Sequence, residues 1–178
     1  MLKFTVIAWA LLAATPTLAQ ISPMAKLDVM KGVWKGQAKG YGLGGKPYQV
    51  TQTERVGPMN GGDLLVIEGR GYGDDKALQF NAFGVVSWNP QTQGYEFRAY
   101  NSGYAVTAPF KLDGEVGQWE MPAGSNAVVR FTLDFSTPGV WHETGQYVAS
   151  GQPARPILDM TLQRVGDTDW PTAGAVQP

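Results

Sequence analysis

Hydrophobic and polar residues alternate with a period of two along most of this chain. Alternation of this kind predicts β-strands that bury one face and expose the other. Turn-forming residues separate the runs, as at Gly42–Gly45, Gly57–Gly61 and Asn89-Pro90. The pattern predicts ten strands, at Val33–Tyr41, Pro47–Val56, Asp63–Tyr72, Leu78–Trp88, Tyr95–Asn101, Tyr104–Leu112, Val116–Met121, Ala127–Phe135, Gly139–Val148 and Pro156–Val165.

Most of the predicted connections are short, which favours an antiparallel meander. An open sheet of ten strands would leave two unpaired edges, and closure into a barrel removes them. We therefore expect an all-β fold, a single antiparallel meander barrel of about ten strands. A β-sandwich and an outer-membrane barrel are the alternatives. Lys35, Gln37 and Lys39 share one face of the first strand, and a lipid-facing band would not accommodate them.

A short helix is predicted before the first strand. Ser22 is a suitable N-cap, and Pro23 suits the first helical position. Leu27 and Met30 provide a narrow apolar stripe, and Gly32 ends the helix.

The first residues have the pattern of a secretory signal peptide. Lys3 is followed by an apolar run from Phe4 to Ala14, and the small residues Thr17 and Ala19 precede a suitable cleavage point. The apolar run is shorter than the ~20 residues that span a bilayer. We expect a periplasmic or secreted protein without a membrane span. The expected divisions are a signal peptide at 1–19, a lipocalin-like barrel at 20–166 and a flexible C-terminal tail at 167–178.

Composition excludes several kinds of chemistry. The 178 residues include no Cys and a single His, His142, so thiolate sites and multi-histidine metal sites are not possible. The 14 Lys and Arg residues nearly balance the 15 Asp and Glu residues, without a basic block. Nucleic acid is therefore not an expected partner, because it requires a concentrated basic face.

The start of the first strand resembles a known superfamily. The motif Gly32-x-Trp34-x-Gly36-x-x-x-Gly40 follows the predicted short helix. A Gly-x-Trp in this place is similar to the calycins, which include the lipocalins, the fatty-acid-binding proteins and the nitrobindin-like barrels. The extended motif and the closing Leu162-Gln163-Arg164 look most like nitrobindin-like and related bacterial secreted barrels. The resemblance implies that Trp34 packs at the closed end of the barrel near Arg164.

The chain departs from the nitrobindin-like pattern at the haem ligand. Those proteins hold haem through a His near the start of the last strand, where this sequence has Arg155-Pro156-Ile157. His142 lies one strand earlier, beside Glu143, in a position typical of a surface residue. We expect no cofactor.

Several predicted strands carry charged residues between apolar neighbours. One hypothesis is that Arg98, Glu120, Arg130 and Glu143 point into the barrel and pair there, since buried charges need partners. Tyr100 shares a face with Arg98, and Trp141 shares one with Glu143. The candidate ligand-binding residues are therefore Arg98, Tyr100, Glu120, Arg130, Trp141 and Glu143.

The alternative is that the opposite face of each of these strands points into the barrel, with the charged residues outside. In Tyr95–Asn101, Phe97 and Ala99 form an equally good inward face, which would place Arg98 outside. The first strand offers a second clue, because Gly36, Ala38 and Gly40 share the face of Trp34 and would leave space inside, which either a neighbouring aromatic ring or a ligand fills.

Three functions are compatible with this sequence. The first is a barrel that binds one small, partly apolar ligand in its lumen, with a carboxylate as a candidate head group held by Arg. The second is a cavity enzyme in which Glu120 or Glu143 is a general base beside Arg98 or Arg130. The third is a filled barrel that acts as a structural or protein-contact module. An oligomeric state is not predicted.

Overall fold

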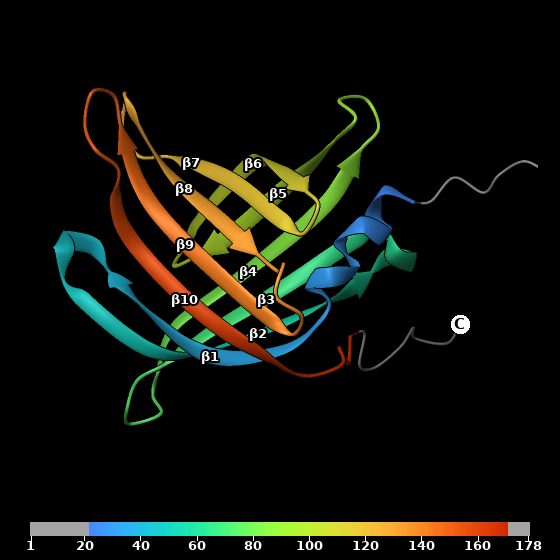
Figure 1. The fold of residues 1–178 in the computed structure, drawn as a ribbon, viewed down its shortest axis with the longest axis horizontal. Helices are drawn as coiled ribbons and strands as arrows, with labels where there is room; N and C mark the ends of the chain where they lie inside the picture. The colour runs from blue at the N-terminus through green and yellow to red at the C-terminus, as the bar shows by residue number, and fades with distance from the viewer. Residues whose placement is uncertain (1–21, 171–178) are drawn as a thin grey trace, which may run out of the picture.

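The structure, a computed structural model, describes residues 22–170. In this range the chain forms one closed barrel of ten antiparallel strands in meander order, with β1 completing the circle between β2 and β10 (Figure 1). The predicted fold is thus confirmed. The predicted signal peptide at 1–19 and the last eight residues of the predicted tail lie outside the described residues.

The ten strands lie close to their predicted positions. They are β1 Gly32–Tyr41, β2 Pro47–Met59, β3 Leu64–Tyr72, β4 Leu78–Asn89, β5 Gly94–Asn101, β6 Tyr104–Asp113, β7 Val116–Pro122, β8 Ala127–Asp134, β9 Val140–Ala149 and β10 Arg155–Gly166. Three short 3₁₀ helices accompany them, η1 Pro23–Met30, η2 Leu43–Gly45 and η3 Asn60–Gly62.

Strand β2 continues three residues beyond its predicted end, through Gly57 and Pro58 to Met59. Beyond Val56 it pairs only with β3, where Pro58 lies opposite Leu65. A strand with one free side does not need the backbone N–H that proline lacks. The proline therefore marks the end of pairing with β1 and not the end of the strand.

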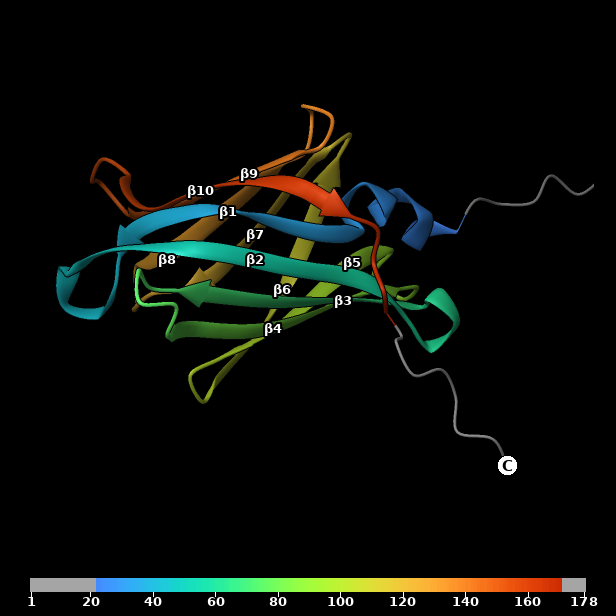
Figure 2. The ribbon, with the colours of Figure 1, turned by 90° about the horizontal axis from the view of Figure 1, so that it is seen from below.

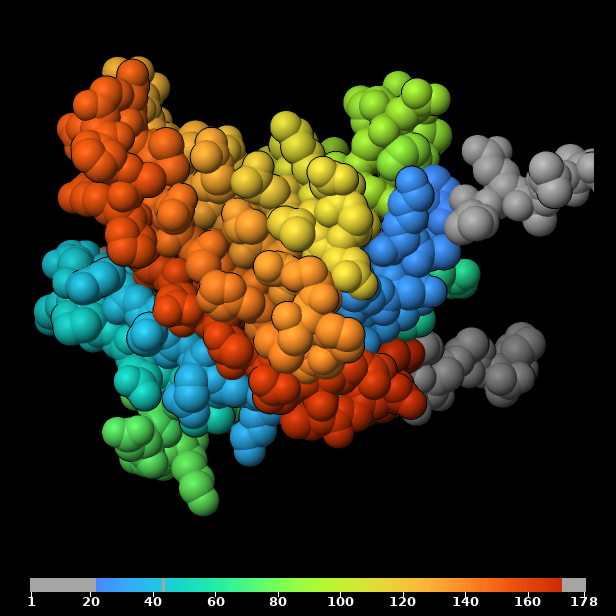
Figure 3. Space-filling model, viewed as in Figure 1, coloured from blue at the N-terminus to red at the C-terminus, as the bar shows by residue number. Residues whose placement is uncertain are grey.

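The predicted N-terminal helix is η1, which closes one end of the barrel (Figures 1 and 3). Ser22 caps it, with its Oγ accepting a hydrogen bond from the Met24 backbone N at 3.3 Å. Leu27 and Met30 are fully buried against the barrel. The Tyr95 hydroxyl donates to the Pro23 carbonyl at 2.6 Å, which ties the start of the helix to β5.

An aromatic cluster lies beneath η1 at this closed end. Trp34 donates from Nε1 to the Met30 carbonyl at 3.0 Å. Its ring meets those of Phe135 and Trp141 edge-on, each with 5.9 Å between centroids. Trp34 lies opposite Arg164 in the β1–β10 register. The Arg164 guanidinium is exposed and donates to the Lys31 carbonyl and to Asp167.

Two glycines of β1 allow the barrel to close tightly. A Cβ on Gly36 would overlap the Thr161 carbonyl of β10, and one on Gly40 would overlap the Ile157 carbonyl. The space expected beside these two glycines is therefore occupied by the backbone of β10, and neither an aromatic ring nor a ligand fills it.

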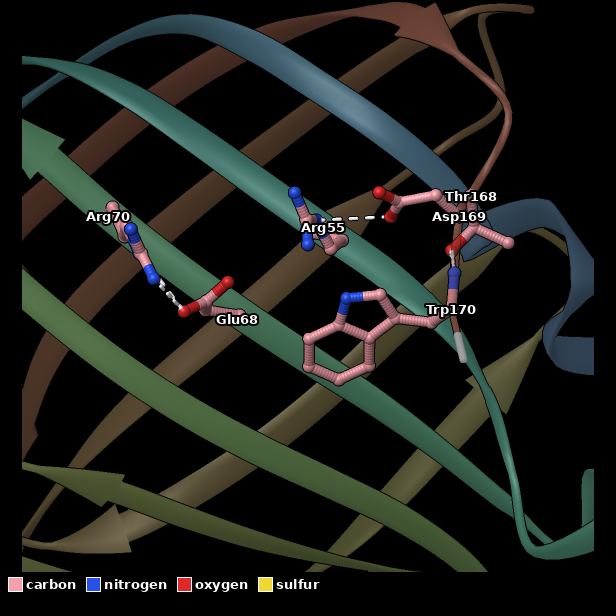
Figure 4. Close-up of polar contacts among 6 residues, drawn as sticks. All are labelled: Arg55, Glu68, Arg70, Thr168, Asp169 and Trp170. Carbon is pink, nitrogen blue, oxygen red and sulfur yellow. Dashed lines mark hydrogen bonds and ion pairs between the residues drawn. The ribbon is translucent and has the colours of Figure 1, made fainter. Parts of the chain in front are cut away.

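After β10 the chain turns across the outer face of the barrel (Figure 2). Thr168 and Trp170 lie against Gly57, and Asp169 forms an ion pair with Arg55 at 3.3 Å (Figure 4). The Trp170 ring lies 6.3 Å from that of Phe83 on β4. Residues 167–170 thus form a short strap over β2 and β4.

Within residues 22–170, the helices are all too short or too polar to cross a membrane.

Candidate functional site

The lumen contains a buried carboxyl on β2. Glu54 is only 8% exposed and points inward in the same alternation as Val50 and Val56. Gln52 donates from Nε2 to Glu54 Oε1 at 2.7 Å. On the neighbouring strand, Gly69 provides the room, since a Cβ there would lie 2.6 Å from Oε1. Gln52 and Gly69 therefore hold the Glu54 carboxyl in one place.

A second carboxyl approaches from β9. Glu143 lies in the same alternation as the buried Trp141 and Gly145, so it also points inward. Its cross-strand partners are Leu133 on β8 and Met160 on β10, both of which are buried. The Glu143 side chain is half-buried, with its remaining exposure directed to the lumen.

Burial favours the neutral form of both carboxyl groups. It raises the pKa of Glu54 to about 7, against the smaller lowering effect of the Gln52 hydrogen bond. It raises the pKa of Glu143 to about 8, with a further contribution from the charge of Glu54. Geometry also links the two groups: Trp34, the cross-strand partner of Glu54, meets the ring of Trp141, which lies on the same inward face of β9 as Glu143.

The indole of Trp141 adds an unsatisfied donor to this site. Trp141 is 2% exposed, and its buried Nε1 has no hydrogen-bond partner of adequate geometry. The indole N–H is nevertheless near enough to Glu143 to lower the pKa of that carboxyl. A buried donor left unpaired costs free energy, and such groups are rare in folded proteins.

The lumen is lined by aromatic rings between the carboxyl site and the open end. Trp119 stacks on Phe131 with 4.5 Å between centroids, and Phe97 meets Trp119 edge-on at 4.8 Å. All three rings are only partly buried, although they point inward. They present apolar surface to whatever enters the barrel.

The mouth of the barrel lies opposite η1. Tyr48 stands there, and burial together with the charge of Glu143 raises the pKa of its hydroxyl. A depression of about 590 Å³ lies along the ends of β1, β2 and β10, and its lining includes Tyr48 together with the outward residues Lys39 and Asp159. Across the mouth, the Arg155 guanidinium lies 4.8 Å from the centre of the Tyr147 ring. The mouth is thus aromatic, with one cation held on a ring.

Three of the four charged residues predicted to face the lumen lie outside it. Arg130 donates from Nε to Glu120 Oε1 at 2.6 Å on the outer face of β7 and β8. Arg98 forms its ion pair with Glu96 on the outer face of β5. The alternation places Phe97, Trp119 and Phe131 inside, because these rings pack on one another. The hypothesis of an inward Arg–Glu cluster is therefore wrong.

The other candidate residues divide between the two faces. Tyr100 follows Arg98 outward and is 47% exposed. Trp141 and Glu143 point inward, as that hypothesis required. Glu54 was not among the predicted site residues. Its signal in the sequence was the run Val50-x-Gln52-x-Glu54-x-Val56, in which polar residues share a face with residues that a core would bury.

The lumen does not fit the histidine-ligated haem of nitrobindin-like proteins. His142 points outward and lies 3.2 Å from Asp159 through its Nε2. Since it is the only histidine of the sequence, the lumen-facing side of β9 and β10 offers a carboxyl, an indole and a thioether but no imidazole. A haem site of that family would need an imidazole on the inner face.

Comparisons with known proteins support the fold. Among solved structures, the chain is similar to Rv2717c from M. tuberculosis, with a TM-score of 0.59 and 16% sequence identity. The match covers 82% of this chain and 99% of that one. This likeness shows a shared fold. No family model matches the sequence, and no curated protein matches it. The resemblance to the calycins therefore stays a prediction from the sequence.

Proposed function

We propose that this protein is exported and binds one small, partly apolar ligand in the lumen of its barrel. Export rests on the signal-peptide pattern of residues 1–19. N-terminal sequencing of the mature protein tests it, and we expect Gln20 as the first residue. A mature chain that begins at Met1 would contradict export through cleavage.

The arrangement of the lumen supports ligand binding. One end is sealed by η1, while the inward rings nearer the mouth keep accessible surface. Ligand sites are concave and mostly apolar, with a few polar groups that fix orientation. The observation that carries the proposal is the polar group at the base of this apolar lumen, made of Glu54, Glu143 and the unpaired Trp141 donor.

The same geometry argues against the carboxylate head group that the sequence suggested. That suggestion required Arg98 and Arg130 inside the lumen, and both lie on the outer face. A ligand carboxylate at the base would instead meet two protein carboxyl groups. We therefore assign the carboxyl site to a ligand group that donates hydrogen bonds.

A second candidate function is catalysis in the lumen. Carboxyl groups with pKa values of about 7 and 8 exchange protons readily near neutral pH. Glu143 stays available as an acid or base, but without the Arg partner expected from the sequence. This alternative differs from binding only in whether the ligand leaves changed.

Native mass spectrometry of the exported protein tests both functions. We expect a 1:1 complex with a co-purified compound. A variant with a blocked lumen, Ala82→Phe, should lose this compound, while the outer-face control Ala105→Phe keeps it. Ala82 lies opposite Gly69 on the inner face, and Ala105 lies opposite the outward Tyr100.

Chromatography of the recovered compound after incubation with fresh protein separates the alternatives. An unchanged compound supports a binding protein. Conversion that Glu143→Gln abolishes would establish the enzyme. Equal retention by the blocked variant and the control would place the compound outside the lumen and overturn both proposals.

A further inference from the structure

We propose that the lumen site takes an organic cation, an ammonium or amidinium group on an apolar body, which binds between Glu54 and Glu143 and displaces protons from them. This inference rests on the proposed function, since it names the ligand class of the same lumen.

The charges that face the site favour a cation. On β2 the inward polar groups are Tyr48, Gln52 and Glu54, and on β9 they are Glu143 and Tyr147. The inner faces of β1, β3, β4 and β8 beside them carry no charged side chain in the described part of the chain. On β10 the positive charges are Arg155, which lies at the mouth on the Tyr147 ring, and Arg164, which lies opposite Trp34 at the closed end and donates to the Lys31 carbonyl and to Asp167.

Two carboxylates without a counter-charge repel each other in a partly buried site. Burial raises the pKa of Glu143, and the charge of Glu54 raises it further. Without a ligand, protons remove this repulsion. A cation between the two groups removes it as well, and its N–H groups would donate to both carboxylates.

The unpaired indole donor indicates that the site is built for the ionised carboxylate. Trp141 Nε1 is buried without an acceptor of adequate geometry, and it lies near enough to Glu143 to lower the pKa of that carboxyl. A carboxylate has lone pairs for both the indole N–H and a ligand N–H, whereas a protonated carboxyl has fewer acceptor positions. Binding of a cation would stabilise the ionised form of Glu143 and thereby provide the missing acceptor for Trp141.

The Glu54 carboxyl is prepared for such a ligand. Gln52 donates to Oε1, and the carboxyl lies against the backbone of Gly69, so both neighbours hold it in place. The aromatic rings above the site, Phe97, Trp119 and Phe131, match an apolar body attached to the cation.

The exchange of protons for a cation makes binding depend on pH. At pH 6 both carboxyl groups hold a proton, because their pKa values are about 7 and about 8. A ligand cation must then release at least one proton to bind. The affinity should therefore rise with pH, by about tenfold between pH 6 and pH 8 for one released proton.

Isothermal titration calorimetry with three probes of equal tail length tests the inference. The probes are decylammonium, decanol and decanoate, each below its micelle concentration, at pH 6 and pH 8. We expect decylammonium to bind most tightly at pH 8 and to release protons, seen as a dependence of the heat on the buffer. Decanol should bind more weakly with little pH dependence, and decanoate most weakly.

Three variants test whether decylammonium binding and proton release depend on the two lumen carboxyls. Glu54→Gln and Glu143→Gln should each bind decylammonium at least tenfold more weakly at pH 8 and release fewer protons. Glu120→Gln removes a carboxyl from the outer face, and this variant should have the same decylammonium affinity and proton release as the wild type. If a lumen variant does not fold, proton release by the wild-type protein still tests whether the bound cation displaces protons.

The outcomes separate this inference from the proposed function. Decanol or decanoate binding as tightly as decylammonium at pH 8, or decylammonium binding without proton release, would overturn the cation and leave lumen binding intact. Failure of all three probes to bind, together with no co-purified compound, would overturn lumen binding itself.

Discussion

Arg130 and Glu120 are cross-strand partners on the outer face of the barrel, with 2.6 Å between Arg130 Nε and Glu120 Oε1. Each side chain is about two-fifths exposed. The rings of Trp119 and Phe131, one residue away on each strand, stack inside the lumen. The two strands thus present an ion pair to solvent and a stacked pair of rings to the interior at the same level.

Loss of the Arg130 charge should have little effect on stability. We expect Arg130→Met to change the free energy of unfolding by less than ~1 kcal/mol, because exposed ion pairs contribute little. Lys39→Met is the matched control, since Lys39 also pairs with a carboxylate on the outer face, at 3.4 Å from Asp159. Urea unfolding measures both. A loss above ~3 kcal/mol for Arg130→Met alone would mean that the guanidinium is buried.

Removal of the Trp34 ring should be far more costly. Trp34→Ala takes away a buried ring that contacts two other aromatic rings and hydrogen-bonds to η1. We expect a loss of ~3–5 kcal/mol, the range for large aromatic truncations in cores. Tyr104→Ala, at a ring that is largely exposed, is the control. Similar urea midpoints for the two variants would contradict the position of Trp34 in the core.

Stability should fall as the pH rises through neutrality. The carboxyl pKa is raised in the folded state from 4.5 to about 7 for Glu54 and to about 8 for Glu143. Between about pH 4.5 and 8 the folded protein therefore binds more protons than the unfolded chain, and a rise in pH favours unfolding. Each group contributes at most about 1.4 kcal/mol per pH unit.

Replacement of both lumen carboxyls should flatten this dependence. We expect the double variant Glu54→Gln/Glu143→Gln to be more stable relative to wild type at pH 9 than at pH 5, as urea unfolding at both values would show. Glu120→Gln is again the outer-face control. Parallel stability curves for the wild type and the double variant would rule out raised pKa values at these two positions.

The strap of residues 167–170 should depend on the absence of a side chain at Gly57. A Cβ there would overlap Thr168 Oγ1 and lie 2.9 Å from Trp170 Cβ. We expect Gly57→Ala to displace the strap, to shift the emission of Trp170 to longer wavelength and to speed proteolysis after Arg164. Gly42→Ala is the control, because its Cβ would meet only the Lys46 carbonyl at 3.8 Å. Unchanged proteolysis in Gly57→Ala would show that Gly57 does not position the strap.

The set of strands and their order follow from local patterns in the sequence. Alternation with a period of two marks each strand, and short turn segments allow only antiparallel neighbours. The same local information located η1 through Ser22 and Pro23, and it placed Trp34 at the start of the first strand. These features depend on residues close together in the chain, which is why the pattern alone was sufficient.

Which face of each strand points inward depends on contacts that exist only in the closed barrel. In β5 both faces carry aromatic residues, so the alternation is equally compatible with Phe97 or with Arg98 inside. Contacts between strands decide it, since Phe97 packs on Trp119 and against Gly84, where a Cβ would lie 2.5 Å from the ring. That Glu54 and Glu143 face the same lumen likewise follows only from closure, because no local pattern brings the inner faces of β2 and β9 together.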